Sequence, residues 1–183
     1  GTRIATQDGP VAVEELAIGD RLLKQDGTTV PVKWIGRQTV STRFGPAERL
    51  MPVRVLAGAL GDGLPVRDLV LTADHALLID GLLINSGAMV NGTSIINVPL
   101  SEMGKSYTVY HVETEDHDII LAEGAPAETF IDYVGRQAFD NYAEYVALYG
   151  NDRTIPELPQ IRISASRLVP PAIRARLDWC NAA

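Results

Sequence analysis

The chain has 183 residues, 46% of them hydrophobic, which is typical of one globular domain with a full core. Its 23 acidic and 16 basic residues give a formal net charge of -7, and without a dense Lys/Arg cluster we expect no nucleic-acid partner. The single cysteine, Cys180, excludes an internal disulfide and a multi-cysteine zinc site, and we expect a free, exposed thiol there. The longest apolar stretch is broken by Asp80 and Gly81, so we expect no membrane span.

Asp-Gly dipeptides punctuate the first half of the chain, and such dipeptides tolerate the positive φ angles of tight turns. They lie at residues 8–9, 26–27, 62–63 and 80–81. Segments of strand length, rich in β-branched residues, fall between them at 1–6, 11–13, 21–23 and 29–40. We predict strands in these segments, with the first two forming a hairpin around Asp8-Gly9.

Residues 68–72, 76–79 and 82–84 are mostly apolar, which predicts strands buried on both faces. Residues 107–113 and 118–122 are predicted to form another strand pair. No internal repeat of about 20 to 50 residues is evident, and this disfavours a propeller or a solenoid.

The pattern changes after about Asp132. Apolar and aromatic residues recur every three or four positions from Phe139 to Tyr149, which predicts one short amphipathic helix with Asp140 as its cap and Gly150 as its stop.

Prolines punctuate the segment from 154 to 171, which we name the strap and expect to be extended over the surface. A final helical turn or two is predicted to open at Pro170-Pro171. We therefore divide the chain into one domain over 1–132 and a C-terminal extension over 133–183, made of the helix and the Pro-rich strap.

The candidate chemistry begins with Thr72-Ala73-Asp74-His75, a Thr-x-x-His turn between two apolar strands. The bend lets the side chains of Thr72 and His75 reach one common point. An imidazole with an ordinary pKa of about 6.5 exchanges protons close to neutral pH. A purely structural histidine is the alternative for this motif taken alone.

Three blocks of the sequence, in order, resemble the Hint domain, the self-processing module shared by inteins and hedgehog proteins. The first combines a Gly-Thr strand at 1–6 with a Glu-Leu-x-x-Gly-Asp turn at 15–20. The second is the Thr-x-x-His turn, and the third is a closing strand pair at 109–113 and 117–124. The resemblance runs to about Asp132 and is to bacterial hedgehog/intein-like members, whose arrangement the segment 127–130 also resembles.

The resemblance implies an all-β horseshoe of short antiparallel strands with pseudo-two-fold symmetry, followed here by a short helical C-terminal extension. It also implies a reaction. In this family a Cys or Ser a few residues before the Gly-Thr attacks the preceding carbonyl, and the amide becomes a thioester or an ester. Because an amide nitrogen is a poor leaving group, the step needs a proton donor and a polarised carbonyl. The match gives the first task to His75 and assistance with the second to Thr72.

Some positions depart from the family pattern. Splicing inteins end in His-Asn and a nucleophile, whereas this chain continues Gly124-Ala125-Pro126. We therefore expect cleavage of an upstream polypeptide of the same precursor without splicing, with water or a small nucleophile as acyl acceptor. The sequence starts at Gly1 without the expected Cys or Ser, so we expect it to be inactive as it stands.

Two further histidines are candidate catalytic residues. His111 occupies a position where many inteins carry an acidic residue, and it is either a base or a packing residue. His117 is either catalytic or the residue that fixes the turn before the last strand.

Two other classes of function stay open. A metal site would combine His75, His111 and His117 with water, although none of them has the spacing of a recognised zinc motif, and we expect neither metal nor cofactor. The other class is a catalytically inert Hint-fold binding or presentation module. The compartment is open, and one option is secretion as part of a larger bacterial protein.

Overall fold

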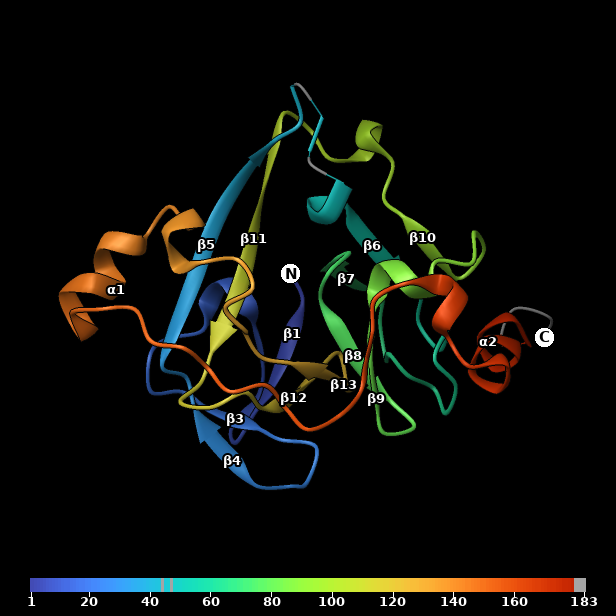
Figure 1. The fold of residues 1–183 in the computed structure, drawn as a ribbon, viewed down its shortest axis with the longest axis horizontal. Coiled ribbons are helices and arrows are strands. Elements are labelled where there is room, and N and C mark those ends of the chain that lie inside the picture. Colours follow the sequence, from blue (N-terminus) through green and yellow to red (C-terminus); the bar gives the residue numbers. More distant parts are fainter. Residues whose placement is uncertain (44, 47, 180–183) are drawn as a thin grey trace.

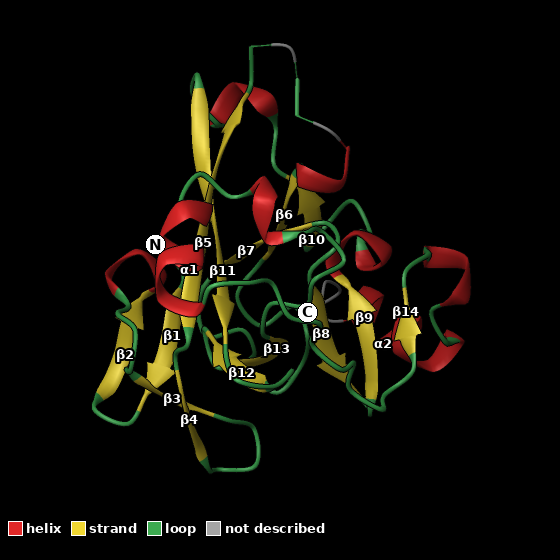
Figure 2. Ribbon diagram, turned by 60° about the vertical axis from the view of Figure 1, so that its left-hand side comes forward, coloured by secondary structure: helices red, strands yellow, loops and turns green. Residues whose placement is uncertain are grey.

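The structure is a computed structural model that describes residues 1–43, 45–46 and 48–179, so Cys180 lies outside the described residues. Short strands make up most of the fold, and the two α-helices lie in the C-terminal extension (Figures 1 and 2). The all-β prediction is confirmed. The elements are β1 (Arg3–Thr6), β2 (Gly9–Ala12), β3 (Arg21–Leu23), β4 (Thr29–Pro31), β5 (Trp34–Ser41), β6 (Pro52–Val55), β7 (Leu69–Thr72), β8 (Ala76–Ile79), β9 (Leu82–Asn85), β10 (Ile95–Asn97), β11 (Ser106–Glu113), β12 (Ile119–Ala122), β13 (Ala125–Glu128), α1 (Tyr142–Tyr149), β14 (Arg162–Ile163) and α2 (Pro171–Trp179).

The strands form three sheets. The largest follows the order β14-β9-β8-β13-β12-β1-β3-β4, with β2 paired to β1, and it curls around the molecule as a horseshoe (Figure 1). A second sheet has the order β10-β6-β7, and a third consists of the long strands β5 and β11. Strands β7 and β8, which flank the Thr-x-x-His turn, therefore belong to different sheets, and the turn lies where two sheets meet.

Local strand predictions succeed better than long-range ones. The hairpin near Asp8-Gly9 forms, with Thr6 opposite Gly9 in an antiparallel pair. The prediction that residues 107–113 pair with 118–122 is wrong. Strand β11 instead pairs along its whole length with β5, whereas β12 pairs with β1 and β13. Eight residues of β5 match all eight of β11, a longer ladder than the four-residue β12 offers.

The first part of the extension packs on β5 and forms a second small core, whose buried members are Trp34, Phe130, Ile131, Phe139, Tyr145 and Ile155. Gly36 allows this approach, because a Cβ atom there would lie 2.9 Å from the ring of Phe139. The predicted helix forms as α1 and stops at Gly150. Asp140 is not its cap, because its carboxylate instead accepts a hydrogen bond from the backbone N–H of Thr39 at 2.8 Å.

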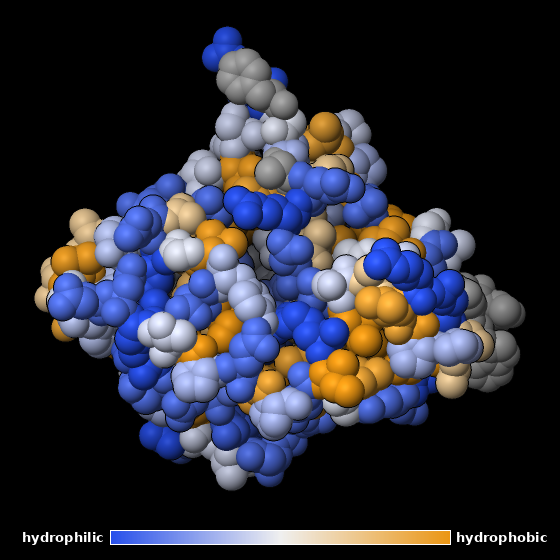
Figure 3. Space-filling view, in the orientation of Figure 1, coloured by the Kyte–Doolittle hydropathy of each residue, from blue (hydrophilic) through white to orange (hydrophobic). Residues whose placement is uncertain are grey.

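The strap crosses the molecule from α1 to α2 (Figure 1). In its middle, β14 pairs in parallel with β9. Helix α2 opens at the predicted prolines, and its Ile173 and Leu177 join the main core. The space-filling view shows polar and apolar residues mixed over one face of the molecule (Figure 3). In the described part of the chain, no helix combines the length and apolarity needed to cross a membrane.

Candidate functional site

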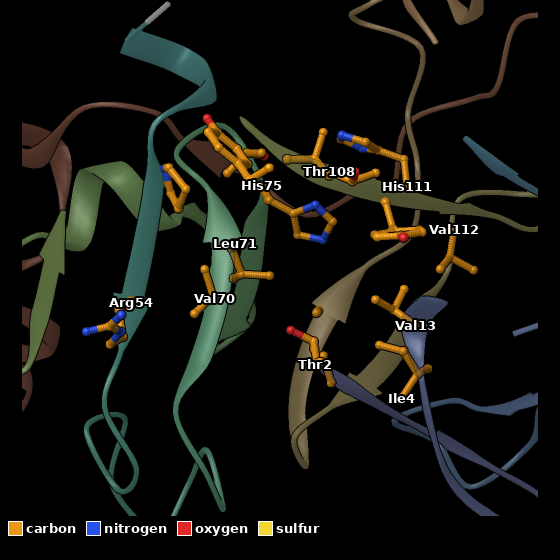
Figure 4. Close-up of a pocket in the computed structure, with 18 of the residues that line it drawn as sticks. Thr2, Ile4, Val13, Arg54, Val70, Leu71, His75, Thr108, His111 and Val112 are labelled. Carbon is orange, nitrogen blue, oxygen red and sulfur yellow. The ribbon is translucent and has the colours of Figure 1, made fainter. Parts of the chain in front are cut away.

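A cavity of about 500 Å³ opens where strands of all three sheets meet. Its walls come from β1, β12 and β13, from β6 and β7, and from β11, and Gly1 and Thr2 reach it at the start of the chain. Figure 4 shows side chains from these separate elements, including Thr2, Val70 and His111, arranged around the same space. Its volume is within the range of small-molecule sites.

The predicted Thr-x-x-His turn forms at the wall of this cavity. The backbone N–H of His75 donates to the Thr72 carbonyl at 3.0 Å, which closes a four-residue turn between β7 and β8. That carbonyl also accepts a hydrogen bond from the Ser86 hydroxyl at 2.9 Å. Both Thr72 and His75 line the cavity, so the turn presents the two side chains to one space as the sequence predicted.

The ring of His75 is oriented by one hydrogen bond. Its Nε2 lies 2.9 Å from the backbone carbonyl oxygen of Glu128. A carbonyl oxygen only accepts, so Nε2 carries the proton and Nδ1 keeps its lone pair when the ring is neutral. Burial lowers the pKa of His75, although the negative charge of Glu128 opposes this effect. The ring is therefore a neutral base near pH 7, and no partner of Nδ1 is found among the described residues.

Glu128 is the residue that sequence reasoning missed. Its side chain is 4% exposed and accepts hydrogen bonds from the backbone N–H of Ala76 at 2.8 Å and from His117 Nε2 at 3.0 Å. Arg162 donates to both carboxylate oxygens, at 3.1 and 2.5 Å. Burial raises the pKa of Glu128, but the hydrogen bonds from His117 and Arg162 outweigh it and lower the pKa to about 2.

His111 reaches the same cavity from β11, with its ring centroid 6.2 Å from that of His75. It packs edge to face against Phe130 and Phe139, at 5.9 and 5.2 Å between centroids. Burial and the neighbouring His75 lower the pKa of His111 to about 3. An imidazole with this pKa is neutral throughout the physiological range, so it offers hydrogen bonds and packing and is a weak base.

His117 is not brought into the cavity. It is buried on the other side of the Glu128 carboxylate, where Nδ1 accepts a hydrogen bond from the backbone N–H of Leu158 at 3.2 Å. Its Nε2 therefore carries the proton that it shares with Glu128. The structure thus groups Thr72, His75 and His111 around one space and sets His117 behind them.

A second buried carboxylate holds the start of the chain, next to residues that line the cavity. Glu123 is 3% exposed and accepts a hydrogen bond from the backbone N–H of Arg3 at 2.7 Å. Arg67 donates to both of its carboxylate oxygens, at 2.9 and 3.2 Å, and also to the Gly1 carbonyl at 3.3 Å. Its only sequence signal is an acidic residue in a tight turn after an apolar strand, where Glu123 has a φ of 48°.

The alternative of a three-histidine metal site finds no grouping to support it. Within the described ranges, no three His, Cys, Asp or Glu side chains come together as a set that could hold a metal ion. His75 Nε2 and His117 Nε2 are both turned to Glu128 instead.

Comparisons with known proteins identify the family and the fold of the chain. The family model of the Hint domain matches residues 1–134. Among solved structures, a variant of the MchDnaB-1 intein is similar, with 19% identity, a TM-score of 0.50, and coverage of 70% of this chain and 96% of the intein. At this identity the likeness shows the fold.

Two other inteins are similar at lower scores. The gp41-1 intein is 11% identical with a TM-score of 0.49, covering 69% of this chain and 92% of its own. A DnaB intein from Synechocystis sp. PCC 6803 is 11% identical with a TM-score of 0.47, covering 71% and 95%. A search of curated protein sequences gives no match.

Proposed function

This chain belongs to the Hint domain family, whose members act on their own precursor chain, and we propose that it catalyses an N-to-S or N-to-O acyl shift at its N-terminal junction. The upstream polypeptide is then cleaved without splicing. One observation carries the proposal: the first residues of the chain line the same cavity as Thr72 and a His75 ring whose Nδ1 lone pair is unoccupied.

Members of the family carry a Cys or Ser a few residues before the Gly-Thr that corresponds to Gly1-Thr2. In the first step, Nδ1 of His75 takes the proton of that thiol or hydroxyl. The sulfur or oxygen attacks the carbonyl of its own upstream peptide bond. A new C–S or C–O bond forms, and the C–N bond breaks as the imidazolium returns the proton to the leaving nitrogen. His75 thus serves first as base and then as acid, for which a neutral imidazole near pH 7 is suited.

The other cavity residues assist this step in our proposal. The hydroxyl of Thr72 donates to the attacked carbonyl oxygen, on which negative charge develops. His111, neutral over the physiological range, holds the upstream peptide by hydrogen bonding and packing. Water or a small nucleophile then attacks the ester or thioester and releases the upstream polypeptide with a new C–nucleophile bond.

Our inference of cleavage without splicing rests on the sequence that follows the closing strand pair. Release of a downstream partner requires an Asn side chain that cyclises, whereas here β12 runs through Gly124 directly into β13. That strand is fixed at Glu128 by three different elements and continues into the packed extension. We therefore assign to this chain only the N-terminal half of the family chemistry.

The test restores the encoded upstream residues, with a reporter peptide, and follows cleavage by intact mass with and without hydroxylamine or a thiol. We expect nucleophile-dependent release that falls about a hundredfold or more in His75→Ala. The matched control is Asp74→Asn in the same turn, because Asp74 is exposed and its change leaves the cavity intact.

Release at the wild-type rate in His75→Ala would remove that residue from the mechanism. A folded protein with Cys or Ser at the junction that releases nothing would contradict the acyl shift. That outcome would leave the Hint fold as a binding or presentation module.

A further inference from the structure

The strap contributes two contacts to the candidate site although it lies beyond the residues that the family model matches. Arg162, in β14, donates to both carboxylate oxygens of Glu128 and also to the Asn85 side chain at 3.1 Å. The Leu158 backbone N–H donates to His117 Nδ1. Only three residues of the strap separate Leu158 from Arg162, and the contacts of both end on one buried cluster. We call it the Glu128 cluster and define it as Glu128, His117 and Arg162.

The donors and acceptors of these hydrogen bonds can be assigned. Since Leu158 donates to Nδ1 of His117, the His117 proton is on Nε2 and points to Glu128. With donors from His117, Arg162 and the Ala76 backbone, the Glu128 carboxylate is held on three sides. The carbonyl of the same residue then receives the Nε2 proton of His75.

Glu128 therefore contacts two consecutive residues, His75 and Ala76. Its carboxylate holds the backbone N–H of Ala76, and its carbonyl holds the ring of the preceding His75. A shift of Glu128 would move the first residue of β8 and the imidazole together. The position of the His75 ring in the cavity consequently depends on the groups that hydrogen-bond to Glu128. The strap supplies the positively charged one, Arg162.

We propose that the strap is part of the site, with Arg162 as a positioning residue that acts through Glu128 to fix the place of His75 and keep its Nδ1 lone pair facing the cavity. This inference rests on the proposed function for its effect on cleavage. Its effect on the pKa and the tautomer of the His75 ring can be measured without cleavage. A Hint domain of this kind would then be completed by a segment outside the family blocks.

The electrostatics give this role a signature that packing alone would not produce. His75 is faced by Glu128 from β13, Arg162 from β14, His111 from β11 and His117 from the turn before β12. Burial lowers the pKa of His75, the Glu128 charge raises it and the Arg162 charge lowers it. Removal of Arg162 leaves the Glu128 charge without its main counter-charge, so the pKa of His75 should rise.

The first measurement uses the 183-residue protein itself and records imidazole ¹⁵N shifts against pH. In the wild type we expect His75 to be neutral near pH 7 with its proton on Nε2. In Arg162→Met we expect a raised pKa of His75, and in Arg162→Lys, which keeps the charge, we expect a pKa near that of the wild type. The control Arg176→Met removes an equal charge from an exposed pair with Asp80 and should leave His75 unchanged.

The second measurement follows cleavage of the precursor with its restored upstream residues. Arg162→Met should slow cleavage about tenfold or more, because small displacements of a reacting group are costly. The acid limb of its rate profile should move to higher pH, since a base with a raised pKa is protonated over a wider range. Arg162→Lys should recover part of the rate.

The outcomes separate this inference from the proposed function. A His75 proton on Nδ1 in the wild type, or an Arg162→Met protein with unchanged pKa and cleavage, overturns the inference. A wild-type precursor that does not cleave contradicts the function, and the NMR titration still decides the role of Arg162. If Arg162→Met does not fold, Glu128→Gln with Arg162→Met removes both charges, and cleavage at the full rate in that protein also overturns the inference.

Discussion

The buried carboxylate of Glu128 accepts hydrogen bonds from three different parts of the chain. Burying a carboxylate without partners costs several kcal/mol of folding free energy. Such a group is therefore retained in a core only when its oxygens accept hydrogen bonds. Here the partners come from β8, from the turn before β12 and from the strap. The residue is therefore both a stabilising group and the support of the candidate base.

The lowered pKa of Glu128 predicts how stability depends on pH. The folded value of about 2 lies below the ordinary value of 4.5, so the carboxylate contributes stability above about pH 4.5 that is lost as the pH falls toward 2. The difference in unfolding free energy between the wild type and Glu128→Gln should therefore shrink by up to about 3 kcal/mol between pH 5 and pH 2. Urea denaturation at several pH values measures it, and a difference that does not vary with pH contradicts the prediction.

At the scale of elements, short-range signals in the sequence are sufficient for local structure. The Asp-Gly turn predicts the β1–β2 hairpin, the prolines predict the start of α2, and Gly150 predicts the end of α1. The Thr-x-x-His spacing predicts that Thr72 and His75 share one space, and the cavity contains both.

Long-range partners leave no such signal. The pairing of β5 with β11 joins segments about seventy residues apart, and their composition does not distinguish it from pairing between neighbouring strands. Asp140 precedes a helix like a cap, yet its carboxylate accepts a hydrogen bond from the backbone N–H of Thr39 on β5, far away in the sequence. Arg162 stands in a Pro-rich segment with no motif, and only the folded chain places it beside Glu128.

A buried ion pair between the end of β11 and the C-terminal extension yields a second prediction. Arg136 and Glu113 form a bidentate pair at 2.7 and 2.9 Å, with side chains 1% and 0% exposed. Arg136→Met leaves a buried carboxylate unpaired and should lower the unfolding free energy by about 3 to 5 kcal/mol. Adding Glu113→Gln should restore much of the loss, because the charge is then gone.

The matched control for this pair lies on the surface. Arg37 of β5 and Glu144 of α1 form an ion pair whose side chains are 51% and 41% exposed. Arg37→Ala should therefore cost at most about 1 kcal/mol. Denaturant titrations compare the variants, and equal losses in Arg136→Met and Arg37→Ala would show that the buried pair has no special weight.

At the scale of the whole molecule, the extension over 133–183 shares its apolar contacts with the rest of the chain. Tyr145 packs on Trp34 of β5, while Ile173 and Leu177 lie in the main core. Two regions that share cores in this way should unfold together.

We accordingly predict a single unfolding transition. In a Trp179→Phe background, Trp34 emission reports the contact between β5 and the extension, and far-UV circular dichroism reports the strands. Their urea midpoints should coincide. An emission change at lower urea than the loss of strand signal would show that the extension detaches first and is a separate unit.

The place of Arg162 along the chain also sets an order of events during synthesis. Under the proposed function, a ribosome makes the upstream polypeptide of the precursor first, then the Thr-x-x-His turn, then Glu128, and the strap only later. Until Arg162 emerges, the Glu128 carboxylate lacks the cation that bridges its two oxygens. In that precursor the proposed site is completed only after the polypeptide upstream of it has been made, which would give that polypeptide time to fold before its release.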